Sequence, residues 1–461
     1  MIDLRRQFTS RVADPIVWGI LKHSPVLDRL SEWRRRQWDS VAEFEGRQKA
    51  LLSDLLTHAA TRVPFYVDRM SGVALDQLRS DPRGHLLRFP MLTKRDLTEN
   101  RDALLCEMGR GTYWNTSSGT TGVPVRFAQD GTYHSAALAT ALLFLEWVGV
   151  EPGSSHIKLW GARRDIGTGR LSLRRRAADW LANRTTLDAF DMTPSTMRRH
   201  LDTIGRVRPA CLEGYVNALY ELADFADREG ISIPRPGCVV SSAGDLQPHM
   251  RDKMESVFRA HVYDRYGTRE TGAVASECNE RHGLHVFGET SIVEIVNDDG
   301  QPVAEGEEGE ILITNLCNYT MPLIRYRIGD RGVLTERRCA CGRPYPMIAR
   351  LAGRSEARVY RQDGGSVLPE YFIYLFGVEY NDGSIVKFQV EQVDWDELVV
   401  RLVAAGGRED EATAHGAEAS ARIVAAMGGV CRVRVELVDR IDPTPTGKHL
   451  HVISRLSGGR S

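Results

Sequence analysis

Between Trp114 and Thr335 the chain alternates short runs of β-branched residues with segments whose apolar residues recur at helical spacing. The runs GCVVSSAG and HVYDRYG have the composition of buried strands, and PHMRDKMESVF has the period of an amphipathic helix. Strands and helices that alternate along a chain pack as a mostly parallel sheet covered by helices. The pattern therefore predicts an α/β fold for this part of the chain.

The segments on either side depart from this alternation. Residues 1–110 carry helix-length periodic segments, among them the leucine-rich stretch at 43–63. From Ile292 to Thr335 several strand-like runs follow one another without a helix, which predicts an antiparallel β subdomain beside the α/β part. We therefore expect a large N-terminal α/β domain, with a helical region at 1–110 and a central region at 111–353, and a small α+β domain at 354–461.

Charge and hydropathy exclude several classes of protein. The 60 Lys and Arg residues balance 61 Asp and Glu, so no net basic field attracts nucleic acid or anionic lipid. The apolar run at 16–21 is shorter than a signal-peptide core, and the run at 135–150 is shorter than the roughly 20 residues of a membrane span. The eight cysteines lack the dense spacing of a disulfide scaffold. We expect a cytoplasmic protein with reduced thiols, no membrane span and no nucleic-acid partner; the sequence does not indicate an oligomeric state.

One short segment, Thr116–Pro124 (TSSGTTGVP), has the composition of a phosphate-binding loop. Its glycines permit close approach of a ligand, and its backbone N–H groups and hydroxyls can surround phosphate oxygens. The GK[ST] ending of a Walker loop is missing, which disfavours a P-loop kinase or GTPase. A polar surface turn is the alternative for a Ser/Thr/Gly cluster taken by itself.

The order of residues in this segment resembles the phosphate-binding signature of the adenylate-forming ligases, and four later segments resemble further signatures in the same order. The Arg-Tyr-Arg before Gly-Asp and the Cys-x-Cys-Gly-Arg at 339–343 are similar to the phenylacetate-coenzyme A ligase family, in particular its capsule-biosynthesis ligase-like branch. This resemblance implies a large α/β domain that binds ATP and the acid, followed by a mobile C-terminal domain that carries the catalytic lysine. The four later segments are Tyr266–Glu270, Pro322–Asp330, Gly353–Ser355 and Pro445–Lys448.

The resemblance implies that ATP activates a carboxylic acid, which we expect to be aromatic, to an acyl-adenylate with release of pyrophosphate. The acyl group then passes to coenzyme A. One alternative keeps adenylation but transfers the acyl group to an amine, a hydroxyl or a carrier-protein thiol in natural-product or polysaccharide biosynthesis. Another is a non-catalytic nucleotide- and zinc-binding assembly protein, against which the retention of Lys448 in a chain with seven lysines argues.

The resemblance also assigns chemical roles to single residues. Lys448 is expected to stabilise the transition state at the α-phosphate of ATP. The alternative is a solvent-exposed lysine at the tip of a turn. Glu270 is the expected Mg²⁺ ligand, because Mg²⁺ prefers one or two carboxylates together with substrate phosphates, and a surface carboxylate is the alternative. Thr268 is the nearest hydroxyl donor. Asp330 accepts hydrogen bonds from the ribose hydroxyls or caps a turn, and Arg354 contacts the ribose.

The remaining site residues follow from the same segments. Small and aromatic residues beside a nucleotide site form a flat apolar slot for an acid, or they pack in the core. The expected slot consists of Tyr215, Ala243, Gly244 and Tyr266. The expected nucleotide-binding residues are Ser117, Ser118, Gly119, Thr120, Thr121, Gly122, Ala243, Gly244, Tyr266, Gly267, Asp330 and Arg354.

Three positions depart from the family pattern. Val123 stands where a lysine often follows the second glycine, so one phosphate contact is missing. The hinge aspartate pair is replaced by Glu356-Ala357, which retains one carboxylate. Arg269 occupies a position that usually carries a hydroxyl.

A second group of residues has the composition of a metal site. Cys278, His285, Cys339 and Cys341 supply three thiols and one imidazole, the donor set of a closed structural zinc site. The two halves of the group lie far apart in sequence, so buried reduced thiols beside a surface histidine are the alternative. The resemblance favours zinc, with His282 as a reserve fourth ligand, and a zinc here would tether two loops that adjoin the nucleotide.

Overall fold

A computed structural model describes residues 4–10, 25–106, 111–116, 126–160, 177–189, 194–354, 359–362, 366–367, 372, 375–376, 380, 382–442 and 450–456. The chain divides into two compact units. The first consists of Met1–Ile328 and Gly332–Ala352, and the second of Gly329–Arg331 and Gly353–Ser461. Among the helices of the described ranges, none has the length and apolar character needed to cross a bilayer.

The N-terminal part of the first unit is helical. Its longest helix, α3 (Val41–Arg62), begins with a capping box in which Ser40 and Glu43 exchange side-chain and backbone hydrogen bonds. Leucines at helical spacing, among them Leu52 and Leu56, bury one side of α3 in the core. The other helices before the sheet are α1 (Leu4–Phe8), α2 (Val26–Arg36), α4 (Pro64–Arg69), α5 (Leu75–Ser80), α6 (Pro82–Leu86), α7 (Lys94–Glu99) and α8 (Arg101–Leu104).

Eleven strands of the described residues form one sheet in the order β10-β11-β12-β13-β9-β8-β7-β6-β5-β3-β4. One half is parallel and consists of β3 (His156–Leu159), β4 (Arg184–Leu187), β5 (Cys211–Tyr215), β6 (Cys238–Ser242) and β7 (Val262–Thr268). The other strands are β8 (Gly272–Ser276), β9 (Leu284–Val286), β10 (Ser291–Val296), β11 (Gly309–Asn315), β12 (Tyr326–Thr335) and β13 (Met347–Arg354).

The antiparallel strands expected from Ile292 onward therefore do not form a separate sheet. The hairpin between β7 and β8 reverses the chain direction, and β9 then pairs with both β8 and β13. Hydrogen bonding thus continues from the parallel half into the antiparallel half. Two further strands, β1 (Tyr113–Thr116) and β2 (Arg126–Gln129), pair with each other alone.

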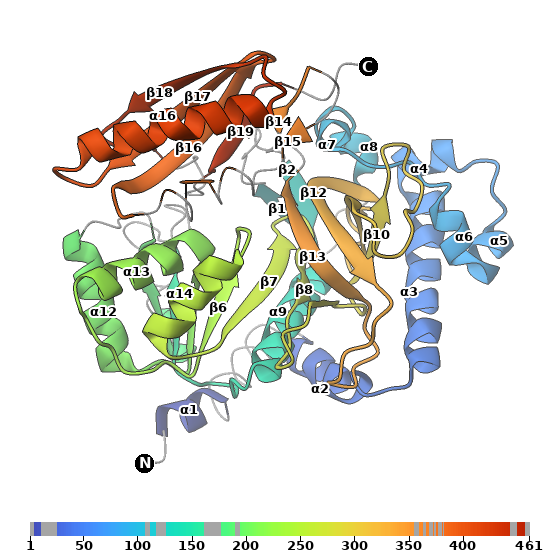
Figure 1. Ribbon diagram of the computed structural model, residues 1–461. Helices are drawn as coiled ribbons and strands as arrows, with labels where there is room; N and C mark the ends of the chain where they lie inside the picture. The colour runs from blue at the N-terminus through green and yellow to red at the C-terminus, as the bar shows by residue number, and fades with distance from the viewer. Residues whose placement is uncertain are drawn as a thin grey trace. The chain divides into compact units, whose positions relative to one another are not determined.

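Alternation along the parallel strands sends side chains to two separate cores. Ile157, Leu212 and Val239 pack on one face with α12 (Pro194–Val207), α13 (Val216–Arg228) and α14 (Pro248–Phe258), which lie together beside the sheet (Figure 1). Cys211 and Val240 point to the other face and pack with α9 (Gly131–Trp147). The apolar run at 135–150 thus belongs to a buried helix, as its length predicts.

The second unit contains a four-stranded sheet in the order β18-β17-β16-β19, with helix α16 (Glu409–Ala426) packed on it. The hairpin of β16 (Ile385–Asp394) and β17 (Glu397–Ala404) is antiparallel, and α16 connects β17 to the parallel strand β18 (Arg432–Leu437). The remaining strands are β14 (Val359–Tyr360), β15 (Ser366–Val367) and β19 (Val452–Ser454).

Candidate functional site

The carboxyl ends of the parallel strands lie at one edge of the sheet, which is the usual location of ligand sites in open α/β folds. Trp160 follows β3 and Tyr215 ends β5, and their ring centroids are 4.3 Å apart. Ala243, directly after β6, has a φ of +60°. A Cβ on Gly244 would lie 2.3 Å from Cγ1 of Val216, so only glycine fits against the start of α13. An aromatic pair and a tight turn therefore stand at this edge, from strands that are neighbours in the sheet.

Glu270 lies in the turn between β7 and β8 and is 7% exposed. The hydroxyl of Tyr326 donates to Oε1 of Glu270 at 3.4 Å. The side-chain amide of Gln129 donates to the carbonyls of Arg269 and Glu270 at 2.9 and 3.3 Å. Tyr326 of β12 therefore contacts the carboxylate, and Gln129 of β2 holds the backbone of the turn that carries it.

The same turn uses the hydroxyl of Thr268. Thr268 Oγ1 lies 3.0 Å from Thr271 Oγ1 and accepts a hydrogen bond from the backbone N–H of Thr271 at 3.2 Å. This geometry gives Thr268 a clear structural role in closing the turn that carries Glu270. Its catalytic role stays a prediction.

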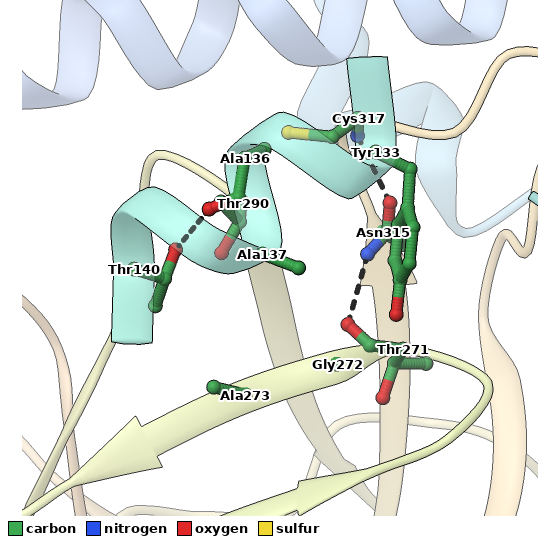
Figure 2. Close-up of a pocket in the computed structure, with 10 residues that line it drawn as sticks. All are labelled: Tyr133, Ala136, Ala137, Thr140, Thr271, Gly272, Ala273, Thr290, Asn315 and Cys317. Carbon is green, nitrogen blue, oxygen red and sulfur yellow. Dashed lines mark hydrogen bonds between the residues drawn. The ribbon is translucent and has the colours of Figure 1, made fainter. Parts of the chain in front are cut away.

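Side chains of helix α9 and strand β11 pack against the turn. Figure 2 shows Tyr133 extending from α9 toward Thr271 and Gly272, beside a small pocket. The amide of Asn315 donates to the carbonyl of Thr271 at 3.0 Å. Burial raises the pKa of Tyr133 well above its ordinary value, so this hydroxyl stays neutral under the carboxylate.

Tyr266 and Gly267, both expected near the nucleotide, have packing roles in the structure. The Tyr266 side chain is buried in the core of the first unit. A Cβ on Gly267 would lie 2.4 Å from the carbonyl oxygen of Gly272 and 2.9 Å from Cα of Ala273. Both neighbours are backbone atoms of β8, so the close approach of the two strands requires glycine here.

We therefore expect Gly267→Ala to lower the free energy of unfolding by about 1 to 3 kcal/mol, the usual range for overpacking. Urea unfolding followed by circular dichroism measures the change. Gly46→Ala is the matched control, because no heavy atom lies within 4 Å of the added Cβ on the exposed side of α3. That variant should unfold at equal or higher urea concentration, since alanine favours helix. Equal stability of both variants would contradict the steric argument.

Of the remaining predicted site residues, Asp330 and Arg354 lie in described strands and the others lie outside the described part of the chain. Asp330 is buried within β12, and Arg354 is the last residue of β13. The roles assigned to both remain predictions. The predicted residues outside the described ranges are Ser117, Ser118, Gly119, Thr120, Thr121, Gly122, Val123, Glu356, Ala357 and Lys448.

Cys278, His285, Cys339 and Cys341 meet in space, with their four donor atoms within 4.8 Å of one another. Cys278 Sγ lies 3.6 Å from Cys339 Sγ, and Cys341 Sγ lies 3.4 Å from His285 Nε2. A tetrahedral ion with Zn–S bonds of about 2.3 Å has edges of about 3.8 Å between its ligands, so the donor set and its spacing fit zinc. His282 is exposed and is not part of the group, so the fourth donor is the imidazole of His285 and the reserve ligand is not needed.

The protonation of His285 and Cys341 also suits a soft metal ion. Burial, followed by the charge of Arg343, lowers the pKa of His285 to about 4, so the imidazole is neutral near pH 7. Burial raises the pKa of Cys341, but hydrogen bonds involving Arg343 outweigh it and leave that pKa below its ordinary value. Burial raises the pKa of Cys278 to about 12 and also raises the pKa of Cys339, so zinc must displace protons from these two thiols when it binds.

Sequence patterns did not single out four polar residues on the parallel strands. Glu213 lies in β5 with a side chain that is 2% exposed, surrounded by His156, Lys158 and Arg265. A detectable signal was present, because strands buried in a parallel sheet are normally continuous apolar runs and HIKL and CLEGY carry charges in their interior.

Comparison with known proteins shows which sequences this chain is similar to. The model of the CapK C-terminal domain matches residues 359–455. Phenylacetate-coenzyme A ligase from Thermus thermophilus is 28% identical over 325 residues, which cover 67% of this chain and 70% of the relative. Protein CapK from Staphylococcus aureus is 21% identical over 375 residues, which cover 80% of each chain.

The fold is shared with solved structures of adenylate-forming ligases. A crystal structure of 2-hydroxyisobutyryl-CoA ligase in the postadenylation state, in complex with R3-HIB-AMP, superimposes with a TM-score of 0.72 at 21% identity and covers 92% of both chains. The predicted fold class, a large α/β part with a small α+β C-terminal part, is thereby confirmed. The chain therefore shares the fold of these ligases, and its sequence is similar to those of phenylacetate-coenzyme A ligases and of CapK.

Proposed function

We propose that the protein is an AMP-forming acid–thiol ligase that activates a carboxylic acid with ATP and transfers the acyl group to coenzyme A. The observation that carries this proposal is the position of Glu270, which is buried and held by Tyr326 and Gln129 at the carboxyl edge of the parallel strands. The names of the relatives support coenzyme A as the acceptor.

The chemistry requires positive charge, because a carboxylate must attack the α-phosphate of ATP and both are anions. Glu270 is proposed to hold Mg²⁺ beside the phosphates, where the ion neutralises their charge when bound. Lys448 is proposed to stabilise the negative charge that develops at the α-phosphate. Ser117–Gly122 are proposed to bind the terminal phosphates through backbone N–H groups and hydroxyls.

The acid is proposed to bind against the aromatic pair Trp160 and Tyr215, with Ala243 and Gly244 beside it. Two aromatic rings within 4.3 Å of each other offer an apolar surface that suits an aromatic acyl group. A structural zinc at Cys278, His285, Cys339 and Cys341 is proposed to fix the loop after β8 to the loop between β12 and β13. Such a closed site orders the protein and takes no part in the reaction.

A second candidate function keeps adenylation and changes the acceptor to an amine, a hydroxyl or a carrier-protein thiol. The observation in its favour is that the C-terminal unit, which is expected to carry Lys448, matches the CapK family model. Adenylation and acyl transfer are separate half-reactions, so the first can be conserved while the second differs.

A screen of carboxylic acids with purified protein, ATP and Mg²⁺ tests both candidates. We expect acid-dependent ATP–pyrophosphate exchange, and net AMP formation that rises when coenzyme A is added. Exchange without any effect of coenzyme A would favour the second candidate. No exchange with any aromatic, aliphatic or hydroxy acid would contradict adenylation itself.

Glu270→Gln should raise the Mg²⁺ concentration that gives half-maximal exchange by about tenfold or more, the scale seen even when a partner of a metal ligand is lost. The substitution removes the charge and keeps the shape. Mg²⁺ titration of exchange measures the shift, with the exposed Glu45→Gln in α3 as a control. An unchanged titration with normal turnover would remove Glu270 from the metal site.

A further inference from the structure

The proposed acid site adjoins a buried group of charged side chains on the face of the sheet that α9 covers. Glu213 is 2% exposed and lies 2.6 Å from Arg265, 2.9 Å from His156 and 3.1 Å from Lys158. Arg265 also lies over the ring of Phe144 in α9, at 5.9 Å. The group is thus part of the folded interior, two residues before Trp160 and Tyr215 along their strands.

The described members of this group hold more positive than negative charge. Lys158 and Arg265 face the single carboxylate of Glu213, while the nearby Arg184 is neutralised by Asp179 at 2.6 Å. Burial lowers the pKa of His156 and of Lys158, and Glu213 offsets only part of this effect. A buried positive charge that is incompletely paired is unfavourable, and a bound anion or acceptor relieves it.

Lys158 is the member of the group that a ligand can reach. Its side chain is 27% exposed, compared with 15% for Arg265 and 11% for His156. Its ammonium lies 5.6 Å from the ring centroid of Trp160, on the neighbouring aromatic pair. An ammonium has three N–H donors, so pairing with Glu213 leaves capacity for an acceptor on a ligand.

The distance across the sheet limits the kind of acid that fits. Strand β3, which carries Lys158, is separated from β7 by β5 and β6, so three strand spacings of about 4.8 Å place roughly 14 Å between Lys158 and the end of β7. An acid that has its carboxylate near Glu270 and its far end near Lys158 must span much of this distance. The Lys158 ammonium lies 3.1 Å from Glu213 of β5 and so extends from its own strand toward β7. A ring with a distal polar group can span the distance that remains, and a two- or three-carbon acid is too short.

We propose that Lys158 is a specificity-determining residue, which binds an anionic or hydrogen-bond-accepting oxygen substituent at the far end of an aromatic acid lying against Trp160 and Tyr215. This inference rests on the proposed adenylation of a carboxylic acid. It narrows the substrate class from aromatic acids in general to aryl acids with a distal oxygen substituent. A site built to bond a polar group discriminates strongly against analogues that lack it.

The test compares ATP–pyrophosphate exchange with phenylacetate, 4-methylphenylacetate, 4-hydroxyphenylacetate and 4-carboxyphenylacetate. We expect the wild type to show a kcat/KM about 10 to 100 fold higher for the two oxygen-bearing acids, the range for a hydrogen bond to a charged group. Lys158→Met should abolish this preference mainly through KM of those acids, and Lys158→Arg should retain part of it. The control Lys253→Met removes a surface lysine paired with Asp227 and should change nothing.

The outcomes separate this inference from the proposed function. No exchange with these four acids or with any acid in the wider screen would contradict the proposed function. Exchange in which the wild type prefers phenylacetate or its methyl analogue would overturn the role of Lys158 alone, as would an equal loss for all four acids in Lys158→Met. The wild-type preference is measured without any variant, so the inference stays testable if Lys158→Met does not fold.

Discussion

Replacing Lys448 with alanine is expected to lower ATP–pyrophosphate exchange by about 10² to 10³ fold, the scale for removing one group that stabilises charge in a transition state. Lys448 is one of seven lysines in the chain and follows Pro-Thr-Gly near its end. A compact ammonium on a turn can stabilise the charge that develops at the α-phosphate while contributing little to the binding of ATP before reaction. The loss should therefore appear in kcat, with nearly unchanged affinity for ATP.

Single-turnover formation of acyl-adenylate and equilibrium binding of ATP distinguish these effects. Lys387→Ala removes another lysine of the same C-terminal unit, in β16, and is the matched control. Exchange at the wild-type rate in Lys448→Ala would show that Lys448 is not the catalytic lysine. A parallel loss of ATP affinity would instead assign it to ground-state binding.

Local periodicity predicted the main elements of the fold, because each helix or strand buries apolar side chains that recur along the sequence with the period of that element. The run GCVVSSAG contains β6 (Cys238–Ser242), and the segment PHMRDKMESVF is α14 (Pro248–Phe258). These patterns reflect contacts within one element or between neighbours in sequence. Such contacts are encoded in short stretches of residues.

Pairing between distant strands left no comparable local signal. The sequence indicated a separate β subdomain from Ile292 onward, whereas β8 and β9 join these strands to the parallel half in one sheet. The pairing of the strand edges depends on the register of the β7–β8 hairpin and on the packing of α9. Neither can be predicted from a short stretch of sequence.

Side-chain contacts between distant segments of the site were likewise not predictable from local sequence. Motif order predicted the importance of Glu270 and also marked the segment Pro322–Asp330, which contains Tyr326. It did not indicate that Tyr326 bonds Glu270, or that Gln129, which lies in no motif, holds the turn. Glu213 and Lys158 meet only because β3 and β5 are neighbours in register. Buried charges in strands that should be apolar were the available clue, and their partners became apparent only in three dimensions.

The cysteine–histidine group leads to the second large expected effect, which is the loss of zinc, stability and activity together on chelation. We expect about one zinc per chain in protein purified without a histidine tag. Removal should lower the melting temperature by roughly 5 °C or more, because the free energy of metal binding contributes to folding. The ion would join the loop after β8 to the loop between β12 and β13, and the hairpin that carries Glu270 includes β8.

Substitution of single cysteines tests whether this effect belongs to the four proposed ligands. Cys339→Ser should retain less than about a tenth of an equivalent of zinc and show the lowered melting temperature, because three ligands hold the ion far less tightly than four. Cys106→Ser changes a half-buried thiol outside the group and should keep both zinc and stability. Zinc content near zero in the wild type, with no response of the melting temperature to chelator, would identify the four residues as reduced thiols and a buried histidine. A full equivalent of zinc with unchanged stability after removal would place the ion elsewhere, because a closed site that joins two loops cannot lose its metal without loosening them.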